Sequence, residues 1–191
     1  MNFVEEKICL EGCVKSEEVL KVDTFLNHQV DPALMAEVGK EFARLTRDLG
    51  ITRVVTIESS GIAPAQMTAL ELGVPMVIMK KSNSKILSNA LQTEVFSFTK
   101  NVHYQLTVKP EYIHQGDRVL LVDDFMANGE AAQGAIRLIE QAGAEVAAVG
   151  IVIEKTFQPG RGLLEEAGYR VFSLARVAAM AEGNITFVSE K

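Results

Sequence analysis

The chain has 191 residues, of which 48% are hydrophobic and 23% are charged, and its formal net charge is -6 at pH 7. This composition is typical of a globular protein, and the length allows one domain, residues 1–191, to bury a three-layer core. The acidic balance argues against a protein that binds nucleic acid, because such binding depends on clustered lysine and arginine side chains.

The apolar stretches are too short for a membrane protein. Among the longest is Val146–Ile153, and residues 1–7 carry two glutamates where a secretion leader would be basic and apolar. We therefore expect a soluble, cytoplasmic protein with no membrane partner. Cys9 and Cys13 match neither a disulfide framework nor a zinc site, so we expect them on a buried or half-buried helix face.

From Asp31 onward, helical and strand patterns alternate. Asp31 and Pro32 are typical of a helix start, and Gly50 marks the end of that helix. The elements expected in this half are a helix over 31–49, a strand over 52–58, a helix over about 64–72, a strand over 75–79 and a polar, mobile loop over 80–92.

The second half continues the alternation after a hairpin. The expected elements are hairpin strands over 94–99 and 102–108, a buried strand over 119–122, a helix over about 130–141, a buried strand over 146–153, a short helix over 162–167 and a last strand over 169–175. Strands that alternate with helices predict an α/β fold with a mostly parallel sheet covered on both faces. Ligands of such sheets bind beyond the carboxyl ends of the strands.

The most informative segment is residues 119–131. The apolar run Val119–Val122 leads into Asp123 and Asp124, and small residues follow at the start of a helix. Carboxylates suit vicinal hydroxyls, and the free amides of a helix start suit a phosphate, so the segment predicts a sugar-phosphate pocket. The alternative is that the two acids end a strand and cap a turn. The coincidence of acids, small residues and helix start favours the pocket.

This segment resembles the diphosphoribosyl-binding signature of type I phosphoribosyltransferases. That signature has four apolar residues, two acids and a short loop that is usually rich in Thr and Gly. Here the loop has no threonine, so it must rely on backbone amides and on Asn128. Its residues are Ala127, Asn128, Gly129, Glu130 and Ala131.

Residues 20–29, 56–64 and 152–160 extend the resemblance to the bacterial xanthine phosphoribosyltransferases. The resemblance implies the type I phosphoribosyltransferase fold, with a small amino-terminal hood from residues 1–30 and a mobile loop and hairpin over about 80–108. It also implies transfer of a phosphoribosyl group from phosphoribosyl diphosphate to xanthine, with Mg²⁺ and in a homodimer that serves purine salvage. No metal ligand is assigned directly.

The same resemblance assigns the remaining site residues. Xanthine would contact Leu20, Asn27 and Lys155, and diphosphate would bind the loop at Ser59, Ser60 and Gly61, with Lys81 from the polar loop. Without the resemblance, purely structural alternatives stay open. Leu20 would be a core residue, Asn27 a turn residue, the two lysines solvated surface residues, and the loop at 59–61 a turn capped by serine.

The chemistry implied requires no covalent nucleophile. We find no Ser/His/Asp or Cys/His set, and we expect His28, His103 and His114 to be surface or packing residues. Two rivals remain: a phosphoribosyltransferase for guanine, hypoxanthine or adenine, and a regulator that keeps the pocket but binds nucleic acid without catalysis.

Overall fold

The computed structural model describes residues 1–82, 89–97, 102–181 and 183–189. Its helices are α1 (Phe3–Glu11), a π-helix (Asp23–Asn27), α2 (Pro32–Leu45), α3 (Ile62–Leu72), α4 (Glu130–Gln141) and α5 (Gly160–Glu166), with short 3-10 turns at Arg47–Leu49 and Pro110–Tyr112. Its strands are β1 (Cys13–Val14), β2 (Leu20–Lys21), β3 (Arg53–Ile57), β4 (Met76–Ser82), β5 (Leu91–Ser97), β6 (Val102–Val108), β7 (Arg118–Met126), β8 (Glu145–Lys155), β9 (Val171–Ala181) and β10 (Asn184–Phe187).

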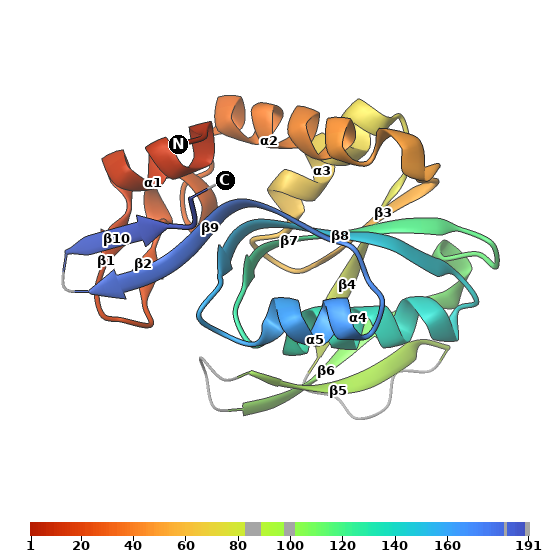
Figure 1. Cartoon of the computed structure of the whole chain (residues 1–191). Helices are drawn as coiled ribbons and strands as arrows, with labels where there is room; N and C mark the ends of the chain where they lie inside the picture. Colours follow the sequence, from red (N-terminus) through yellow and green to blue (C-terminus); the bar gives the residue numbers. More distant parts are fainter. Residues whose placement is uncertain (83–88, 98–101, 182, 190–191) are drawn as a thin grey trace.

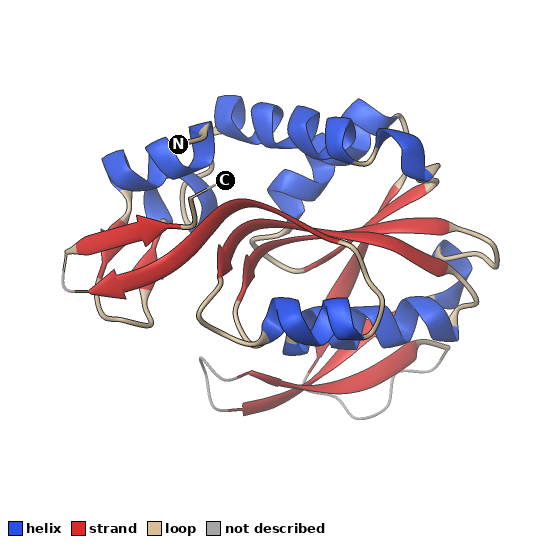
Figure 2. Ribbon diagram, in the orientation of Figure 1, coloured by secondary structure: helices blue, strands red, loops and turns tan. Residues whose placement is uncertain are grey.

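One sheet of eight strands, in the order β10-β9-β8-β7-β3-β4-β6-β5, forms the centre of the described part of the chain. The five middle strands pair in parallel, while β10 and the β5–β6 hairpin are antiparallel at the two edges. Figures 1 and 2 show α2 and α3 on one face of this sheet and α4 and α5 on the other. The predicted α/β fold with a mostly parallel sheet is confirmed.

Each face of the sheet has its own apolar core. One core joins the hood, α2 and α3 to the sheet through residues such as Phe25 and Phe42, and the other joins α4 and the β5–β6 hairpin through residues such as Ile136 and Leu106. Gly134 allows the hairpin to approach α4, because a side chain there would collide with Val95.

The start and end of α2 follow from its sequence. The Asp31 side chain accepts hydrogen bonds from the amides of Ala33 and Leu34, at 3.0 and 3.1 Å, so it caps the helix as predicted. The predicted helix over 31–49 is interrupted at Thr46, whose hydroxyl donates to the Phe42 carbonyl at 2.7 Å.

The hood is built from α1, the β1–β2 ladder and the π-helix. It is fastened to the rest of the chain by the Asn2 side chain, which donates to the Leu174 carbonyl at 2.5 Å, and by Lys7, which pairs with Asp31 at 2.9 Å. The expectation for the cysteines is wrong, because Cys9 and Cys13 are both exposed. The buried residues of α1 are Val4, Glu5 and Ile8, and Cys13 lies beyond that helix, in β1.

Several predicted boundaries are also corrected. The sheet does not end at residue 175, because β9 continues to Ala181 and pairs with the additional strand β10. The predicted loop over 80–92 is strand at both ends, since Lys80–Ser82 pair with β6 and β5 begins at Leu91. The middle of that prediction, residues 83–88, lies outside the described residues. The hairpin itself is confirmed by antiparallel pairing of β5 with β6.

Among the described residues, no helix is both long and apolar enough to cross a membrane. The organisation as a single domain stays a prediction.

Two glycines in helices make the packing testable. An alanine at Gly39 in α2 would place its Cβ 2.6 Å from the Met67 carbonyl carbon in α3, whereas one at Gly162 in α5 would have no atom within 4 Å. We expect Gly39→Ala to lower the free energy of unfolding by about 1–3 kcal/mol and Gly162→Ala to raise it by up to about 1 kcal/mol. Urea denaturation of both variants checks this, and shifts of the same sign would contradict it.

Candidate active site

The candidate site lies at the carboxyl edge of the sheet, where the chain reverses its direction across the sheet. From β3 the chain crosses to β4 on one side, and from β7 it crosses to β8 on the other, so the carboxyl ends of β3 and β7 form the topological switch point of the sheet. Parallel sheets usually bind ligands in a crevice at such a point, and we call this edge the crevice. The helices that follow these strands, α3 and α4, cover opposite faces of the sheet and begin at this edge. Their amino-terminal ends carry partial positive charge, which favours anions.

The sequence predicts the two acids at the end of a strand, but in the structure they lie inside β7, which continues to Met126. The pairing of β7 with β3 stops at Thr56 and Val122, but its pairing with β8 continues to Met126 and Glu154. Because the pairing with β3 stops at Val122, Asp123 and Asp124 lie in a stretch of β7 that is paired with β8 on one side and, within the described part of the chain, with no strand on the side of β3. The carboxylates therefore stand at the crevice.

Asp123 is the more buried of the two acids, with 9% of its surface exposed. One of its carboxylate oxygens accepts a hydrogen bond from the Asp124 amide at 3.0 Å. Burial and the neighbouring negative charge of Asp124 hold the pKa of Asp123 well above its usual value. An acid pair of this kind favours hydroxyl donors or a cation.

The loop after β3 reaches this acid pair. A Cβ on Gly61 would lie 2.7 Å from the Asp123 carboxylate and 2.5 Å from the Thr56 hydroxyl, so only glycine fits there. The Thr56 hydroxyl is buried and has no hydrogen-bond partner in the part of the chain that the structure describes. The structure therefore brings the predicted loop Ser59–Gly61 against Asp123.

Lys81 and Tyr104 lie on the hairpin side of the acids. The Lys81 amide donates to the Glu58 carboxylate at 2.6 Å, and its ammonium lies 5.4 Å from the centre of the Tyr104 ring. Burial, together with the negative charges of Asp123 and Glu130, raises the pKa of Tyr104 to about 12. Lys81 is thus close enough to place positive charge at the crevice.

The loop 127–131 ends on the first turn of α4. Gly129 is the N-cap residue with φ +80°, and it provides no side chain to cap the helix amides. An anion could therefore take the place of a capping side chain at these amides, and anion binding by this loop stays a prediction. The loop is held from behind by α5, because the Gly160 amide donates to the Ala127 carbonyl at 3.0 Å.

The residues predicted to contact a base are only partly brought together. Lys155 ends β8 and its ammonium donates to the Glu18 carbonyl of the hood at 2.6 Å, lying 5.7 Å from the centre of the Phe125 ring. Burial lowers the pKa of Lys155. Leu20 is buried in the core beneath the hood, whereas Asn27 is exposed at the end of the π-helix.

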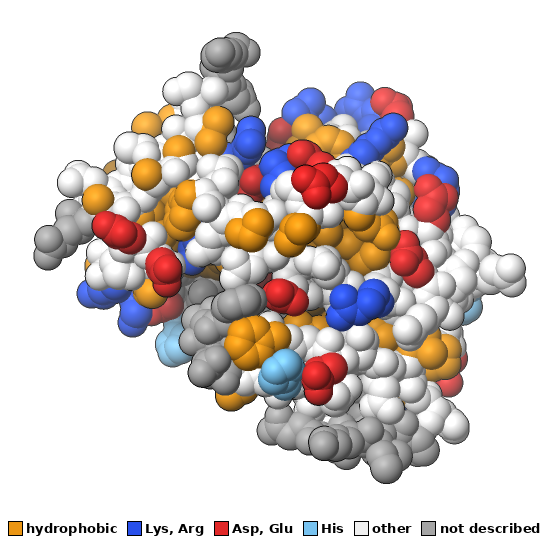
Figure 3. Space-filling view, turned by 60° about the horizontal axis from the view of Figure 1, so that its bottom comes forward, with side chains coloured by type: hydrophobic (Ala, Val, Ile, Leu, Met, Phe, Trp, Pro, Cys, Tyr) orange, Lys and Arg blue, Asp and Glu red, His pale blue; other side chains and the backbone are white. Residues whose placement is uncertain are grey.

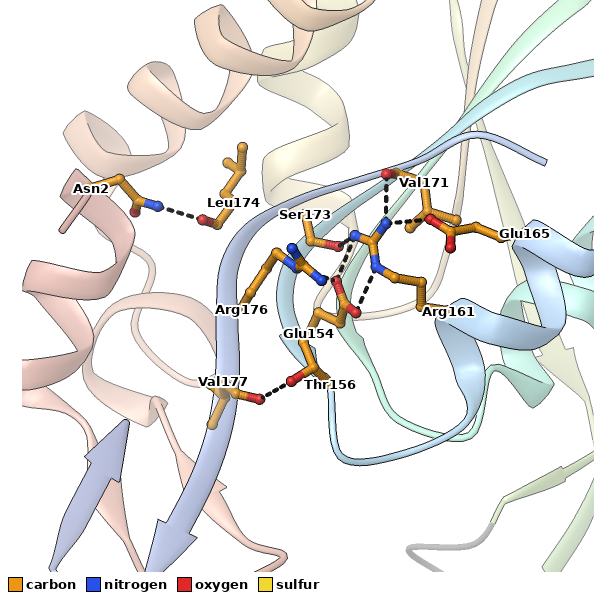
Figure 4. A network of polar contacts seen from close by, with 10 residues as sticks. All are labelled: Asn2, Glu154, Thr156, Arg161, Glu165, Val171, Ser173, Leu174, Arg176 and Val177. Atoms are coloured by element: carbon orange, nitrogen blue, oxygen red, sulfur yellow. Dashed lines mark hydrogen bonds and ion pairs between the residues drawn. The ribbon is translucent and has the colours of Figure 1, made fainter. Parts of the chain in front are cut away.

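Sequence reasoning missed Tyr104, Phe125 and a buried ion pair between Glu154 and Arg161, which is shown in Figure 4. Phe125 could have been found, because it follows the acids within the signature. Tyr104 lies on a hairpin strand and has no motif signal. As expected, the three histidines are surface residues: His28, His103 and His114 are exposed.

Residues 28–178 match the family model described as the phosphoribosyl transferase domain. A xanthine phosphoribosyltransferase of Acinetobacter baumannii is 56% identical over 191 residues, which is 100% of each chain. A xanthine phosphoribosyltransferase 1 of Clostridium botulinum is 57% identical over 189 residues, 98% of this chain and 100% of the relative. The crystal structure of the APRTase from Giardia lamblia with 9-deazaadenine superimposes with a TM-score of 0.77 at 25% identity, covering 91% of this chain and 97% of that one.

The raised pKa of Asp123 predicts a pH dependence of stability. The pKa of Asp123 is higher in the folded protein than its unfolded value of 3.8, so the folded state binds this proton more tightly. The resulting stability is present at low pH and is lost as the pH rises through the folded pKa. We therefore expect Asp123→Asn to be more stable than the parent protein, by a margin that grows as the pH rises above about 4. Thermal unfolding followed from pH 4 to 8 measures that margin.

Asp117, at the amino end of β7, is the matched control. Although burial opposes it, hydrogen bonds from the His114 amide and from Arg53 keep the pKa of Asp117 below its usual value. Asp117→Asn should therefore destabilise the protein above pH 5, whereas Asp123→Asn should stabilise it. A margin for Asp123→Asn that stays constant with pH would contradict the assignment of a raised pKa.

Proposed function

The chain belongs to the phosphoribosyltransferase family, and we propose that it transfers the 5-phosphoribosyl group from phosphoribosyl diphosphate to xanthine. The products are xanthosine 5′-monophosphate and diphosphate, and the role is purine salvage. The observation that carries the proposal is the contact of the Ser59–Gly61 loop with Asp123 in the crevice beside the first turn of α4. The identity of 56% over the full chain supports xanthine as the base.

In this proposal the ribose 5-phosphate lies along the end of β7. The amides of the loop 127–131 hold the 5-phosphate, supported by the uncapped start of α4. Asp123 and Asp124 accept hydrogen bonds from the ribose hydroxyls. Their negative charge also stabilises the positive charge that develops at the anomeric carbon as diphosphate leaves.

The diphosphate lies over the loop after β3. The backbone at Ser59, Ser60 and Gly61 binds its oxygens, and Lys81 neutralises part of its charge. The described residues contain no cluster of three His, Cys, Asp or Glu side chains that could bind a metal by themselves. Two carboxylates nevertheless suit Mg²⁺ that also binds substrate phosphates, so Asp123 and Asp124 would hold it together with phosphoribosyl diphosphate. Mg²⁺ would offset the charge of the leaving diphosphate.

Xanthine lies between the end of β8 and the hood. The Lys155 ammonium has three N–H donors, of which the Glu18 carbonyl uses one, so two remain for the carbonyl oxygens of an oxopurine. Asn27 reads the base edge with its amide, and Leu20 contributes to the apolar floor. The base nitrogen then forms a bond to the anomeric carbon, the bond from that carbon to diphosphate breaks with its electron pair going to diphosphate, and the proton of the nitrogen passes to solvent water. The protein mainly positions the reactants.

The homodimer and the cytoplasmic location belong to the same proposal. A nucleic-acid-binding regulator is the less favoured alternative. On the face seen in Figure 3, acidic and basic side chains are interspersed and no broad basic patch is visible, which gives a nucleic-acid backbone little to bind.

Base choice is the central test. We expect the protein to release diphosphate with xanthine and not with adenine, because adenine carries an amino group where Lys155 requires an acceptor. Lys155→Ala should lower kcat/KM for xanthine by about tenfold to more than a hundredfold, since an oxygen loses a charged donor at a cost of roughly 1–3 kcal/mol. Asn27→Ala should instead narrow the difference in kcat/KM between xanthine and guanine.

Kinetics with xanthine, guanine, hypoxanthine and adenine, for the parent protein and both variants, measure these effects. A parent protein that prefers adenine would refute the placement of the base.

The acid pair gives a separate prediction about phosphoribosyl diphosphate. Asp123→Asn and Asp124→Asn should each raise its KM by roughly tenfold to a hundredfold, because a charged hydrogen-bond acceptor is lost. The KM for xanthine should change less than about threefold. Asp117→Asn, at the other end of β7, serves as control. Steady-state kinetics check this, and parental KM values for phosphoribosyl diphosphate in both variants would count against the ribose contact.

A further inference from the structure

The buried ion pair of Glu154 and Arg161 lies next to both halves of the proposed site without being part of either. Glu154 is 1% exposed and directly precedes Lys155 on β8. Arg161, in the first turn of α5, donates to both of its carboxylate oxygens, at 2.8 and 2.7 Å (Figure 4). This fork-to-fork geometry fixes the orientation of both side chains.

Every N–H of the Arg161 guanidinium has an acceptor. Besides the two bonds to Glu154, it donates to the side chains of Glu165 at 2.7 Å and Ser173 at 3.1 Å and to the Val171 carbonyl at 3.1 Å. A guanidinium has five N–H groups, and all five are used. A lysine, with three donors on a single nitrogen, cannot reproduce this arrangement.

Arg161 is also directly bonded to the residue that supports the phosphate loop. Gly160 donates its amide to the Ala127 carbonyl at 3.0 Å, and its Cα lies 3.0 Å from where a Cβ on Gly129 would be. The backbones touch, with no side chain between them. A shift of Arg161 would therefore move the loop that is proposed to hold the 5-phosphate.

Glu154, the other member of the ion pair, directly precedes Lys155, the lysine that is proposed to contact the purine base. Beyond Lys155, both the amide and the hydroxyl of Thr156 donate to the Val177 carbonyl, each at 2.9 Å. The end of β8 is thus fixed by Thr156 on one side of Lys155 and by Glu154 on the other. A shift of Glu154 would change where the Lys155 ammonium reaches the hood.

We propose that Glu154 and Arg161 are positioning residues that set the distance between the 5-phosphate loop and the base lysine. The inference rests on the proposed function of that site. Neither side chain contacts a substrate. Their effect passes through Gly160 on one side and Lys155 on the other, so both substrates should bind less well when the pair is weakened.

The chain contains a matched control for a merely structural ion pair. Arg53 and Asp117 form a comparable pair at the amino ends of β3 and β7, with an N–O distance of 2.7 Å and side chains only 12% and 11% exposed. That pair lies at the opposite end of the parallel strands from the crevice. Arg53→Lys therefore makes the same chemical change far from the proposed site.

The experiment compares Arg161→Lys with Arg53→Lys at a temperature well below the unfolding midpoint of both. We expect Arg161→Lys to raise the KM values for phosphoribosyl diphosphate and for xanthine by roughly tenfold each, because small displacements of positioned groups have large effects. Arg53→Lys should lower the unfolding midpoint and leave both KM values within about twofold. Glu154→Gln, which keeps the shape of the side chain, should also raise the KM values for both substrates. It replaces Arg161→Lys in the comparison if Arg161→Lys does not fold.

Calorimetry with ribose 5-phosphate separates this inference from the proposed function. If the parent protein does not turn over xanthine, the proposed function fails, but weaker ribose 5-phosphate binding in Arg161→Lys than in Arg53→Lys would still support the pair as a positioning device. Unchanged KM values and unchanged ribose 5-phosphate binding in Arg161→Lys would overturn the inference. Equal effects in Arg161→Lys and Arg53→Lys would overturn it as well, since they would indicate a general loss of stability.

Discussion

A buried carboxylate next to a second carboxylate is the interaction around which the crevice is arranged. Removing an ionised acid from water costs several kcal/mol, and Asp123 is 9% exposed beside Asp124. Its surroundings reduce that cost only in part, through the Asp124 amide and the positive charge of Lys81. The loop after β3 packs against the Asp123 carboxylate, and this close approach requires a glycine at position 61.

The features that could be predicted from the sequence are those that short segments specify. The helix over 130–141 was placed correctly because Gly129 and Gly143 bracket it, and both have positive φ. The rule that ligands bind at the carboxyl edge directed attention to strand ends, but the close approach of Gly61 to Asp123 was not predicted and appears only in the structure. The acids were placed at the end of their strand because the apolar run stops at Val122, whereas pairing with β8 extends the strand to Met126.

The features that were missed depend on contacts between distant segments. The strand β10 exists because β9 offers it an edge, and β1 and β2 have only two residues each, too few for any periodicity. Cys9 was placed on a buried or half-buried face, whereas the residues that α1 buries are Val4, Glu5 and Ile8. The partners of Arg161 are spread from residue 154 to residue 173, so its role appears only in the folded chain.

The two sides of the proposed site also differ in whether local or distant contacts build them. The residues proposed to bind the ribose and its phosphate are contiguous, over 123–131. The proposed base side instead joins Glu18 of the hood to Lys155, which is 137 residues away in the sequence. Under the proposed function, residues 123–131 would bind the ribose and its phosphate, and the junction of the hood and β8 would contact the base. The Glu154–Arg161 pair links these two parts, because it is the place where the end of β8 and the support of the phosphate loop are held together.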